Sequence, residues 1–361
     1  MIAATVPAAL RDRVKALAAE AGFDFCGITR PRVAARDAAA LRAWVDAGHH
    51  ADMWWMAEEE RLARRMRPAS LLDGVRSVIC VAMRYTPPQP ATTDGQPRGI
   101  VAAYAWGSDY HKVMKRRLRR LARALDRLLG RHDQRIFVDT APVLEHALAA
   151  SAGIAWQGKH SLSLNRTGGS WLLLGELFTT AELPCDPPAT HHCGSCRACI
   201  DACPTGAIVA PFVVDARRCI AWLTIEYDGP IPPPLRPLLG RRIFGCDDCQ
   251  TVCPWNRAVA APHPDLLAPK NENRAPLLTE LLTLDEAGFR IRFRGTPLRR
   301  GGRIRLVRNA CIAAGNSGDR RLIPPLRALL RDEAPLLREH AAWALERITR
   351  PEPESPAPAD P

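Results

Sequence analysis

The stretch CGSCRACIDACP (193–204) places four cysteines in the order C-x2-C-x2-C-x3-C and follows the last of them with Pro204. Three thiolates at this spacing can enclose one face of a cubane iron–sulfur cluster, while the fourth points toward a second cluster. A second run, CDDCQTVCP (246–254), repeats the pattern with one cysteine missing, and Cys219 lies between the two runs. The sequence therefore predicts two [4Fe–4S] clusters within residues 185–260.

Eight cysteines fill two cubanes without remainder if the two runs exchange their last ligands. The first cluster is predicted to take Cys193, Cys196, Cys199 and Cys253, and the second Cys203, Cys219, Cys246 and Cys249. Structural zinc is the alternative, because C-x2-C pairs also suit tetrahedral Zn²⁺. The two Cys-Pro endings and the x2-x2-x3 spacing favour the clusters, held in a module like that of bacterial ferredoxins.

The other cysteines are predicted to play no part in the clusters. The chain has 12 cysteines in 361 residues and no secretory signal, which disfavours a disulfide framework. Cys26, Cys80 and Cys311 lie in apolar patterns and are expected in the core. Cys185, just before the first run, is either an extra ligand or, as we favour, a bystander.

The chain is basic, with 50 Lys and Arg against 38 Asp and Glu and a formal net charge of +12. This balance favours a polyanionic partner such as a nucleic acid, although an arginine-rich proteome would produce the same excess. An apolar run of about 18 residues, as a membrane helix needs, is missing from the sequence. We therefore expect a cytoplasmic protein without a membrane partner.

Residues 1–184 alternate between strand and helix patterns. Strands are predicted over RSVICVAMRY (76–85), RIFVD (135–139) and SWLLLGELFTT (170–180), which are rich in β-branched and apolar residues. The segment HKVMKRRLRRLARALDRLL (111–129) has apolar residues at helical spacing. Together they predict an α/β domain with helices packed on a sheet.

Residues 275–350 are predicted to form short antiparallel helices that resemble a HEAT-type pair. The helices are expected over 303–319, 320–333 and 334–348. Gly315 and Gly318 are expected to mark the turn after the first helix. The Pro-rich tail, 351–361, is predicted to be disordered.

Several segments of the chain resemble the epoxyqueuosine reductases. The most specific are VDTAPVLEHALAASAGIAWQGKHSL (138–162), CIAWLTIE (219–226) and IFGCDDCQTVCPWN (243–256). Further segments, in the same order as in the family, are MRPASLLDGVRSVICVAMRY (66–85), YAWGSDYHKVMKRRL (104–118), RNACIAAGNSGD (308–319) and HAAWALERI (340–348). The resemblance covers most of the chain. Neither a P-loop nor a dinucleotide-binding glycine fingerprint competes with it.

The resemblance implies a cobalamin enzyme whose base-off cofactor lies between the α/β domain and the cluster module. One cluster would reduce the cobalt, and the electrons would remove the epoxide oxygen of epoxyqueuosine at the wobble position of a tRNA. An unidentified low-potential donor would supply those electrons to a monomeric enzyme. The alternatives are a reductive dehalogenase-like enzyme acting on a small molecule and a non-catalytic electron carrier.

Asp139, which ends the strand pattern RIFVD, matches the proton donor of the family. The chemistry needs an acid because the epoxide oxygen would otherwise leave as an alkoxide. Beside a corrin, desolvation is expected to raise the pKa of this carboxyl. The alternative is that Asp139 or Thr140 caps a helix that begins near Pro142.

Other residues match segments that surround the corrin in the family. They are Tyr104, Lys159, His160, Thr224, Ile225, Glu226 and Gly245. His160 stands where the family commonly has asparagine, and Trp106 stands at a position that is often basic in relatives. His111 is interpreted as structural, because a base-off cofactor needs no histidine ligand.

Two arginine-rich segments are candidates for RNA contacts. The run expected to contact tRNA phosphates consists of Arg299, Arg300, Arg303, Arg305 and Arg308. The arginines of the helix at 111–129, which are Arg116, Arg117, Arg119, Arg120 and Arg123, are more consistent with a solvated face. Trp255 and Trp343 are candidates for stacking on unpaired bases.

Overall fold

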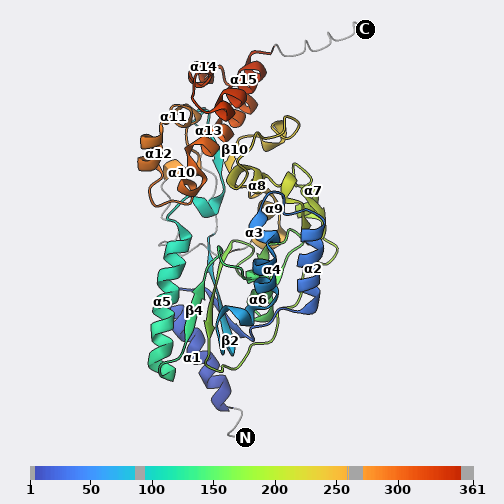
Figure 1. The fold of residues 1–361 in the computed structure, drawn as a ribbon, viewed down its shortest axis with the longest axis vertical. Coiled ribbons are helices and arrows are strands. Elements are labelled where there is room, and N and C mark those ends of the chain that lie inside the picture. Colours follow the sequence, from blue (N-terminus) through green and yellow to red (C-terminus); the bar gives the residue numbers. More distant parts are fainter. Residues whose placement is uncertain (1–4, 86–93, 258, 260–270, 351–361) are drawn as a thin grey trace.

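The computed structural model describes residues 5–85, 94–257, 259 and 271–350. Figure 1 shows the sheet and its helices at one end, the C-terminal helices at the other, and the cysteine-rich module between them. Within the described residues no helix is both long and apolar enough to cross a membrane. The predicted tail, 351–361, lies outside the described residues.

The main sheet has the strand order β1-β2-β7-β4, and each neighbouring pair is antiparallel. Its strands are β1 (Phe25–Thr29), β2 (Ser77–Arg84), β4 (Gln134–Phe137) and β7 (Leu172–Thr179). The predicted strands at 76–85, 135–139 and 170–180 are therefore confirmed, with ends that shift by one or two residues. The two central strands are buried along almost their whole length because helices cover both faces.

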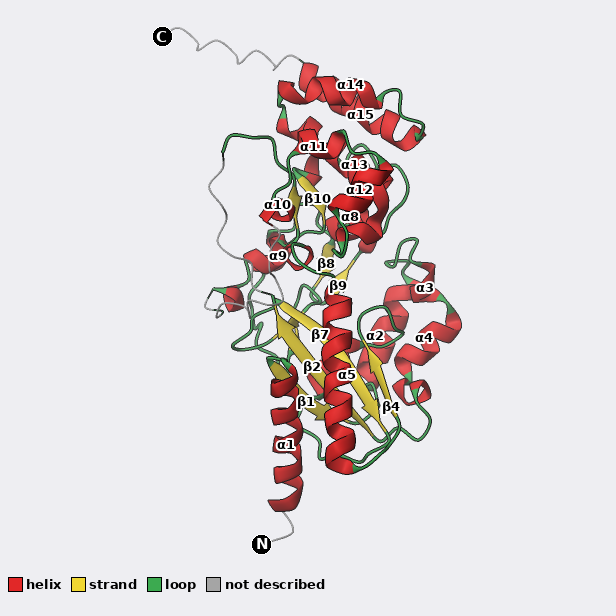
Figure 2. Ribbon diagram, turned by 90° about the vertical axis from the view of Figure 1, so that its left-hand side faces the viewer, coloured by secondary structure: helices red, strands yellow, loops and turns green. Residues whose placement is uncertain are grey.

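Helices cover the two faces of the sheet through alternate residues of its strands. Ile79 of β2 packs toward α1 (Thr5–Ala21) and α5 (Tyr110–Leu129), which cross one face in Figure 2. Its neighbour Val78 points the other way, into a second core with α6 (Glu145–Ser151). This is the period-two alternation of a strand. The first helices after β1 lie at α2 (Ala35–Asp46), α3 (Trp54–Ala57) and α4 (Glu59–Met66).

The cysteine-rich module consists of short elements joined by tight turns. They are α7 (Ala198–Asp201), β8 (Ile208–Ala210), β9 (Val213–Val214), α8 (Ile220–Ile225), β10 (Arg242–Phe244) and α9 (Asp248–Thr251). β10 pairs in parallel with β3 (Ile100–Val101) of the N-terminal domain. A second small hairpin, β5 (Trp156–Gln157) with β6 (Ser163–Leu164), precedes the module.

The C-terminal region is helical, as predicted. Its helices are α10 (Asn271–Arg274), α11 (Leu278–Leu282), α12 (Glu286–Arg292), α13 (Leu298–Ser317), α14 (Ile323–Leu329) and α15 (Pro335–Thr349). Gly318 ends α13 in the left-handed conformation, as expected of a turn. Gly315 instead lies inside α13, where the Cβ of a larger residue would meet the Trp343 ring at 2.7 Å. The prediction that Gly315 belongs to the turn is wrong.

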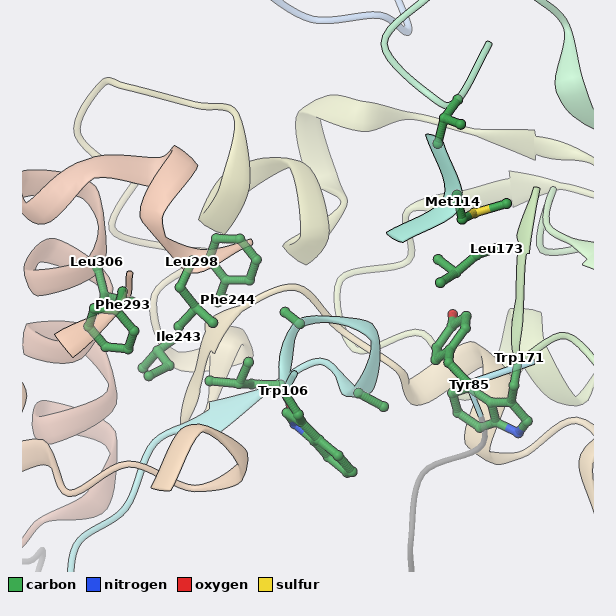
Figure 3. Close-up of a cluster of buried hydrophobic side chains, with 14 of the residues drawn as sticks. Tyr85, Trp106, Met114, Trp171, Leu173, Ile243, Phe244, Phe293, Leu298 and Leu306 are labelled. Carbon is green, nitrogen blue, oxygen red and sulfur yellow. The ribbon is translucent and has the colours of Figure 1, made fainter. Parts of the chain in front are cut away.

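One apolar core runs from the sheet into the C-terminal helices. It joins Met114 of α5 and Tyr85 to Trp106, and Trp106 to Phe244 and Leu298. Figure 3 shows Trp106 between the aromatic residues beside the sheet and the group around Phe244. The α/β domain, the cysteine module and the helical region are thus packed into one body. Cys80 and Cys311 are buried in the core, as predicted.

Candidate active site and cluster module

Asp139 lies just beyond β4, in the loop that leads to α6. Its φ is +56°, a left-handed conformation that residues other than glycine adopt rarely. The Tyr110 hydroxyl donates to Asp139 Oδ2 at 2.7 Å, and His111 Nε2 lies 2.8 Å from the same oxygen. The Asp139 side chain is nevertheless 52% exposed. The carboxyl is therefore held by two side chains and still open to the exterior.

His111 is fixed between two carboxylates. Its Nδ1 lies 2.7 Å from Asp109 Oδ1, while its Nε2 contacts Asp139, so a protonated ring donates from both nitrogens. Burial lowers the pKa of His111, but the hydrogen bonds to Asp109 and Asp139 outweigh burial and raise it overall. Arg300 joins this group, with its Nε 3.6 Å from Asp109 Oδ2.

The pKa of Asp139 is set by its neighbours within the protein. Burial raises it, but hydrogen bonds from His111 and Tyr110 and the nearby positive charges outweigh burial and lower it overall. The rise in this pKa expected beside a bound corrin stays a prediction. Because the two pKa values shift in opposite directions, the proton between these groups is favoured on His111, and Asp139 is the carboxylate that receives its hydrogen bond.

A second pair of carboxyls holds the other side of the same loop. The Asp139 backbone N–H donates to Glu145 Oε1 at 2.6 Å. Glu145 interacts in turn with Glu176 of β7, which is completely buried and finds no other hydrogen-bond partner among the described side chains. Burial and their mutual repulsion raise the pKa of both carboxyls. The two groups can therefore share one proton, since no cation faces Glu176.

The alternative role of Asp139 as a helix cap is wrong. α6 begins at Glu145, its N-cap residue is Leu144, and no side chain caps it. Thr140 and Pro142 lie in bends before the helix. The loop therefore serves to present Asp139 rather than to start α6.

Tyr110 and Glu145 were not identified from sequence, and the role of His111 was underestimated. The tripeptide Asp109–Tyr110–His111 begins α5, with the Asp109 side chain capping the helix by accepting from His111 N. This tripeptide lies within residues 104–118, a segment that resembles the epoxyqueuosine reductases. That resemblance was the signal in the sequence that could have identified it. Both nitrogens of His111 are occupied, so it is not placed to ligate a metal, in agreement with the prediction.

Tyr104, Thr224 and Gly245 meet beside this group. Thr224 Oγ1 accepts from Gly245 N at 2.9 Å, and the Tyr104 ring lies 5.9 Å from the Tyr110 ring. Gly245 has φ +72°, and a Cβ there would meet Ala102 at 2.6 Å. Glycine is therefore required where this backbone passes close to Ala102 and the Tyr104 ring.

Ile225 and Glu226 complete this side of the site. The Ile225 side chain lies in van der Waals range of Gly245. Burial raises the pKa of Glu226, and the charge of Asp139 acts in the same direction. The structure thus gathers most of the predicted cofactor residues around Asp139, namely Tyr104, Thr224, Ile225, Glu226 and Gly245.

Lys159 and His160 lie apart from that group. Lys159 Nζ donates to Gly194 O at 2.6 Å and to Cys196 O at 2.8 Å, so it holds the loop of the first cysteine run. His160 is 4% exposed. Its Nδ1 accepts from Leu162 N, which leaves Nε2–H as a buried donor without a partner. Such an orphaned donor fits a polar group of a bound molecule.

The thiols of the eight predicted ligands gather in two sets of four. Burial and the nearby thiols of Cys253, Cys193 and Cys196 raise the pKa of Cys199. In the second set, Cys249 lies near Cys246 and Cys219, and Cys219 lies near Cys203. These neighbours agree with the groupings of the reciprocal exchange, which stay a prediction, and Cys199 of the first set also lies near Cys249.

The described thiols do not form a site for a single metal ion. No three His, Cys, Asp or Glu side chains among the described residues converge closely enough to enclose one metal ion. A cubane places four irons between its ligands, so its thiolates stand further apart than those of tetrahedral zinc. Ala207 N donates to Cys203 Sγ at 3.2 Å, a backbone contact that also suits an iron–sulfur ligand.

Arg308 was predicted to contact tRNA phosphate, and this prediction is wrong. Its side chain is completely buried. The guanidinium donates to the backbone carbonyls of Leu223, Tyr227 and Gly229. Arg308 therefore joins α13 to the end of α8 and the segment that follows it in the cysteine module.

The other arginines of the run differ in what they can reach. Arg303 and Arg305 are only 16% and 15% exposed, and each forms an ion pair with an aspartate. Arg299 is exposed, and Arg300 is 50% exposed beside Asp109. Only these two of the run are exposed, and of the two Arg300 contacts the group around Asp139, so the run is not one continuous phosphate-binding face.

The predicted stacking tryptophans are engaged within the protein. Trp255 packs against Trp156, and Trp343 packs against α13 at Gly315. Arg116, Arg119, Arg120 and Arg123 are exposed, as expected of a solvated face. Arg117 differs because it donates to a backbone carbonyl at the end of α1.

Taken together, these features indicate a functional class of protein. An acid–base group open to the exterior lies against a module whose thiols form two four-membered sets. The protein is an oxidoreductase that combines iron–sulfur electron transfer with proton transfer.

Comparisons with known families agree with this class. The model described as "Epoxyqueuosine reductase QueG, DUF1730" matches residues 65–140, a 4Fe–4S double cluster binding domain matches 192–256, and HEAT repeats match 298–358. An epoxyqueuosine reductase of Xanthomonas campestris is 46% identical over 340 residues, covering 92% of this chain and 94% of the relative. The chain belongs to the epoxyqueuosine reductase family.

Solved structures give the same result for the fold. A crystal structure of epoxyqueuosine reductase with an epoxyqueuosine-modified stem loop of tRNA-Tyr has a TM-score of 0.87 and 32% identity, covering 94% of this chain and 90% of that one. The Bacillus subtilis epoxyqueuosine reductase, in a form with its catalytic aspartate loop swung out of the active site, has a TM-score of 0.86 at 32% identity. It covers 94% of this chain and 90% of its own.

Proposed function

We propose that this protein reduces epoxyqueuosine in tRNA to queuosine. Two electrons and two protons remove the epoxide oxygen as water and leave a carbon–carbon double bond. The observation that carries the proposal is the environment of the Asp139 carboxyl. This carboxyl is open to the exterior and hydrogen-bonded to His111, and it lies beside the residues that approach the cluster module. Membership of the family supplies the substrate, and this arrangement supplies the acid that the reaction needs.

The proposal assigns the electrons to two [4Fe–4S] clusters. The first is held by Cys193, Cys196, Cys199 and Cys253, and the second by Cys203, Cys219, Cys246 and Cys249. Bound there, the clusters supply electrons singly at low potential. The domain boundaries proposed are 1–184, 185–260 and 275–350, the last of these serving tRNA binding.

The residues around Asp139 fit base-off cobalamin, which we propose as the second cofactor. Tyr104, Ile225 and the Gly245 backbone offer a flat, largely apolar wall, and both ring nitrogens of the nearby His111 are engaged by carboxylates. The buried Nε2–H of His160 is a donor that lacks a partner within the protein. When bound, cobalamin would deliver the electrons to the substrate carbon.

Proton transfer is the part of the reaction that this chain performs itself. Asp139 Oδ2 takes a proton from His111 Nε2 and passes it to the departing oxygen. Asp109 and Tyr110 stay in place, Asp109 by balancing the charge of His111 and Tyr110 by donating to Asp139. A carboxylate with a low pKa can deliver a proton at neutral pH when a neighbouring histidine supplies that proton.

The loop of Asp139 is expected to move. In the B. subtilis enzyme the catalytic aspartate loop has been seen swung out of the active site. Here the corresponding position is held inward by Tyr110, His111 and Glu145 at an unfavourable φ. We propose that these bonds break and re-form as tRNA enters and leaves.

The tRNA is proposed to approach from the side of Arg299 and Arg300, whose side chains can contact phosphates near Asp139. The enzyme is proposed to act as a monomer in the cytoplasm, where tRNA is available. A reductive dehalogenase-like activity on a small molecule is the alternative, and membership of the family disfavours it. A purely electron-carrying role would leave the Asp139 group without a purpose.

Anaerobic turnover tests the proposal. Reconstituted protein, cobalamin and titanium(III) citrate would be mixed with tRNA carrying epoxyqueuosine, and digested nucleosides would be measured by mass spectrometry. Loss of one oxygen that depends on cobalamin is the expected result. No conversion, with clusters and cobalamin demonstrably bound, would contradict the proposed substrate.

A further inference from the structure

An exposed patch surrounds the loop of the first cysteine run. The cluster-side patch, as we name it, consists of Lys159, His191, Cys196, Arg197, Val209 and Phe212. Cys196 is exposed, whereas the other seven proposed ligands are buried or partly buried. Among the patch residues, Val209 and Phe212 are 45% and 42% exposed. A proposed cluster ligand therefore reaches the surface among apolar and basic side chains.

The apolar part of the patch is held in a fixed position. Phe212, at the tip of the β8–β9 hairpin, has φ +70°, which is a rare conformation for a bulky residue. Its N–H donates to Lys159 O at 2.9 Å, and Ser161 Oγ donates to its carbonyl at 3.0 Å. The His191 ring lies 6.0 Å from the Phe212 ring. Backbone strain that presents an apolar ring to solvent points to a binding role.

The charged part of the patch is mainly positive. The ammonium of Lys159 is fixed on the cysteine loop by the two carbonyls described above. Arg197, directly after Cys196, has a side chain that is 61% exposed, with Asp201 at 3.5 Å as its nearest carboxylate. Arg166 lies close by, 2.9 Å from His192. The patch is thus complementary to an acidic surface rather than to a basic one.

The two thiol sets stand in different relations to Asp139. Cys246 of the second set follows Gly245, whose backbone contacts Thr224 and approaches Tyr104. The Tyr104 ring leads to Tyr110, which bonds Asp139. In the first set, Cys196 lies on the exposed loop, and Cys199 lies near Cys249 of the second set. Electrons that enter through the first set can therefore pass to the second set and on to the site.

We propose that the cluster-side patch docks an acidic, low-potential electron-transfer protein that delivers electrons to the cluster of the first set. In each encounter the donor loses one electron and the oxidised cluster gains it, and no bond is made or broken. The apolar contact would come from Phe212 and Val209, and the electrostatic attraction from Arg197 and Lys159. The later fate of the electron rests on the proposed function, whereas the docking does not.

A nucleic acid is the other partner that a basic patch could bind. Figure 1 shows α7, which adjoins the patch, on one side of the molecule, and α12 on the other. Arg299 and Arg300, proposed to meet tRNA, follow α12 in the chain and contact Asp109 and the end of α12. The patch is therefore assigned to the protein donor, and tRNA binding is an outcome of the test.

The experiment compares two reductants on the reconstituted enzyme without tRNA or cobalamin. Reduced bacterial flavodoxin serves as the acidic protein donor and titanium(III) citrate as the small one, with cluster reduction followed by stopped-flow absorbance. The variants are Arg197→Glu and Phe212→Asn, because asparagine tolerates a positive φ better than most residues. Arg13→Glu, an equal charge change on the distant helix α1, is the matched control.

Both patch variants are expected to slow reduction by flavodoxin about ten-fold, through weaker association, and to leave reduction by titanium(III) citrate unchanged. Arg13→Glu should leave both rates unchanged. Equal flavodoxin rates in all variants would overturn the proposal. So would a loss of tRNA affinity in the patch variants at unchanged flavodoxin rates. Slower reduction by both reductants would also overturn it, because that result indicates a damaged cluster.

Discussion

Two pairs of carboxyl groups hold the loop of Asp139, and the pKa values of the two pairs are shifted in opposite directions. On one side, Asp109 and Asp139 are kept ionised by His111 between them, and the pKa of each carboxyl is lowered overall. On the other side, no cation acts on Glu176, and the charge of His111 offsets burial only in part at Glu145, so the pKa of both carboxyls is raised overall. The Asp139 side chain therefore accepts a charged hydrogen bond from His111. Its backbone N–H donates a hydrogen bond to Glu145, which can share a proton with Glu176.

Because of this difference, the two pairs of carboxyls can have different functions although both contact Asp139. The charged side can supply a proton, because His111 holds one that Asp139 can relay. The Glu145–Glu176 side can only position the loop, since its shared proton lies between two carboxyls at the core. Breaking either side should therefore affect the rate, but only the charged side should affect how the rate depends on pH.

Replacement of His111 by glutamine should have the largest effect. Glutamine can still donate to Asp139 but cannot supply a proton, so kcat should fall by about 10²- to 10⁴-fold. Anaerobic single-turnover assays of tRNA would measure it, with cluster content and tRNA affinity as controls. A fall of less than two-fold would show that His111 only supports the fold.

Replacement of Glu176 by leucine should have the next largest effect. It removes the hydrogen bond to Glu145 and frees Glu145 to ionise, so the Asp139 loop should be less well held. A hydrogen bond to a charged group contributes about 1.5–3 kcal/mol, which corresponds to a loss of about 10- to 100-fold in kcat. Hydrogen exchange at residues 138–142 should become faster in this variant.

The matched variant Glu176→Gln separates position from charge. Its amide can still donate to Glu145, so kcat and loop exchange should stay close to wild type. If Glu176→Gln were as impaired as Glu176→Leu, the pair would have a role in proton transfer, contrary to the comparison.

The pH dependence of kcat should show a single alkaline limb. Because the folded-state pKa of His111 is raised, its proton and the stability it contributes are present at low pH. Both are lost as the pH rises through this raised pKa, which lies above the ordinary histidine value of about 6.5. The pKa of Asp139 is lowered, so no acid limb should occur above about pH 4. His111→Gln should lose the alkaline limb; Glu176→Gln should keep it.

Replacement of Arg300 by alanine should have the smallest effect on turnover. Its pairing with Asp109 is half exposed, and such a pair contributes up to about 1 kcal/mol. We expect kcat to fall about five-fold at most, together with weaker binding of tRNA and a weaker dependence of that binding on salt. Unchanged affinity and salt dependence would place the tRNA elsewhere.

Most of the fold could be predicted because its signals are local. The cysteine runs, the three strands and the helix at 111–129 each depend on residues close together in the chain. The grouping of the thiols was also predictable, since the spacing of the two runs leaves one arrangement that fills both clusters.

The acid–base group could not be predicted, because it depends on contacts across the fold. The sequence 138–162 contains Asp139 but says nothing of the ring of His111 beside it, which comes from the start of α5. The lowered pKa of Asp139 follows from that contact and not from burial. Arg308 illustrates the same limit: its place in an arginine-rich run indicated phosphate, whereas the fold turns it inward to three backbone carbonyls.

The central claim is that Asp139 delivers the proton, and Asp139→Asn tests it most directly. Asparagine preserves the shape, tolerates the positive φ and can still accept from Tyr110, but it cannot relay a proton. In anaerobic single turnover, with clusters, cobalamin and tRNA bound as in the wild type, we predict the loss of nucleoside conversion. Conversion at a near-normal rate would contradict the account and remove Asp139 from the reaction.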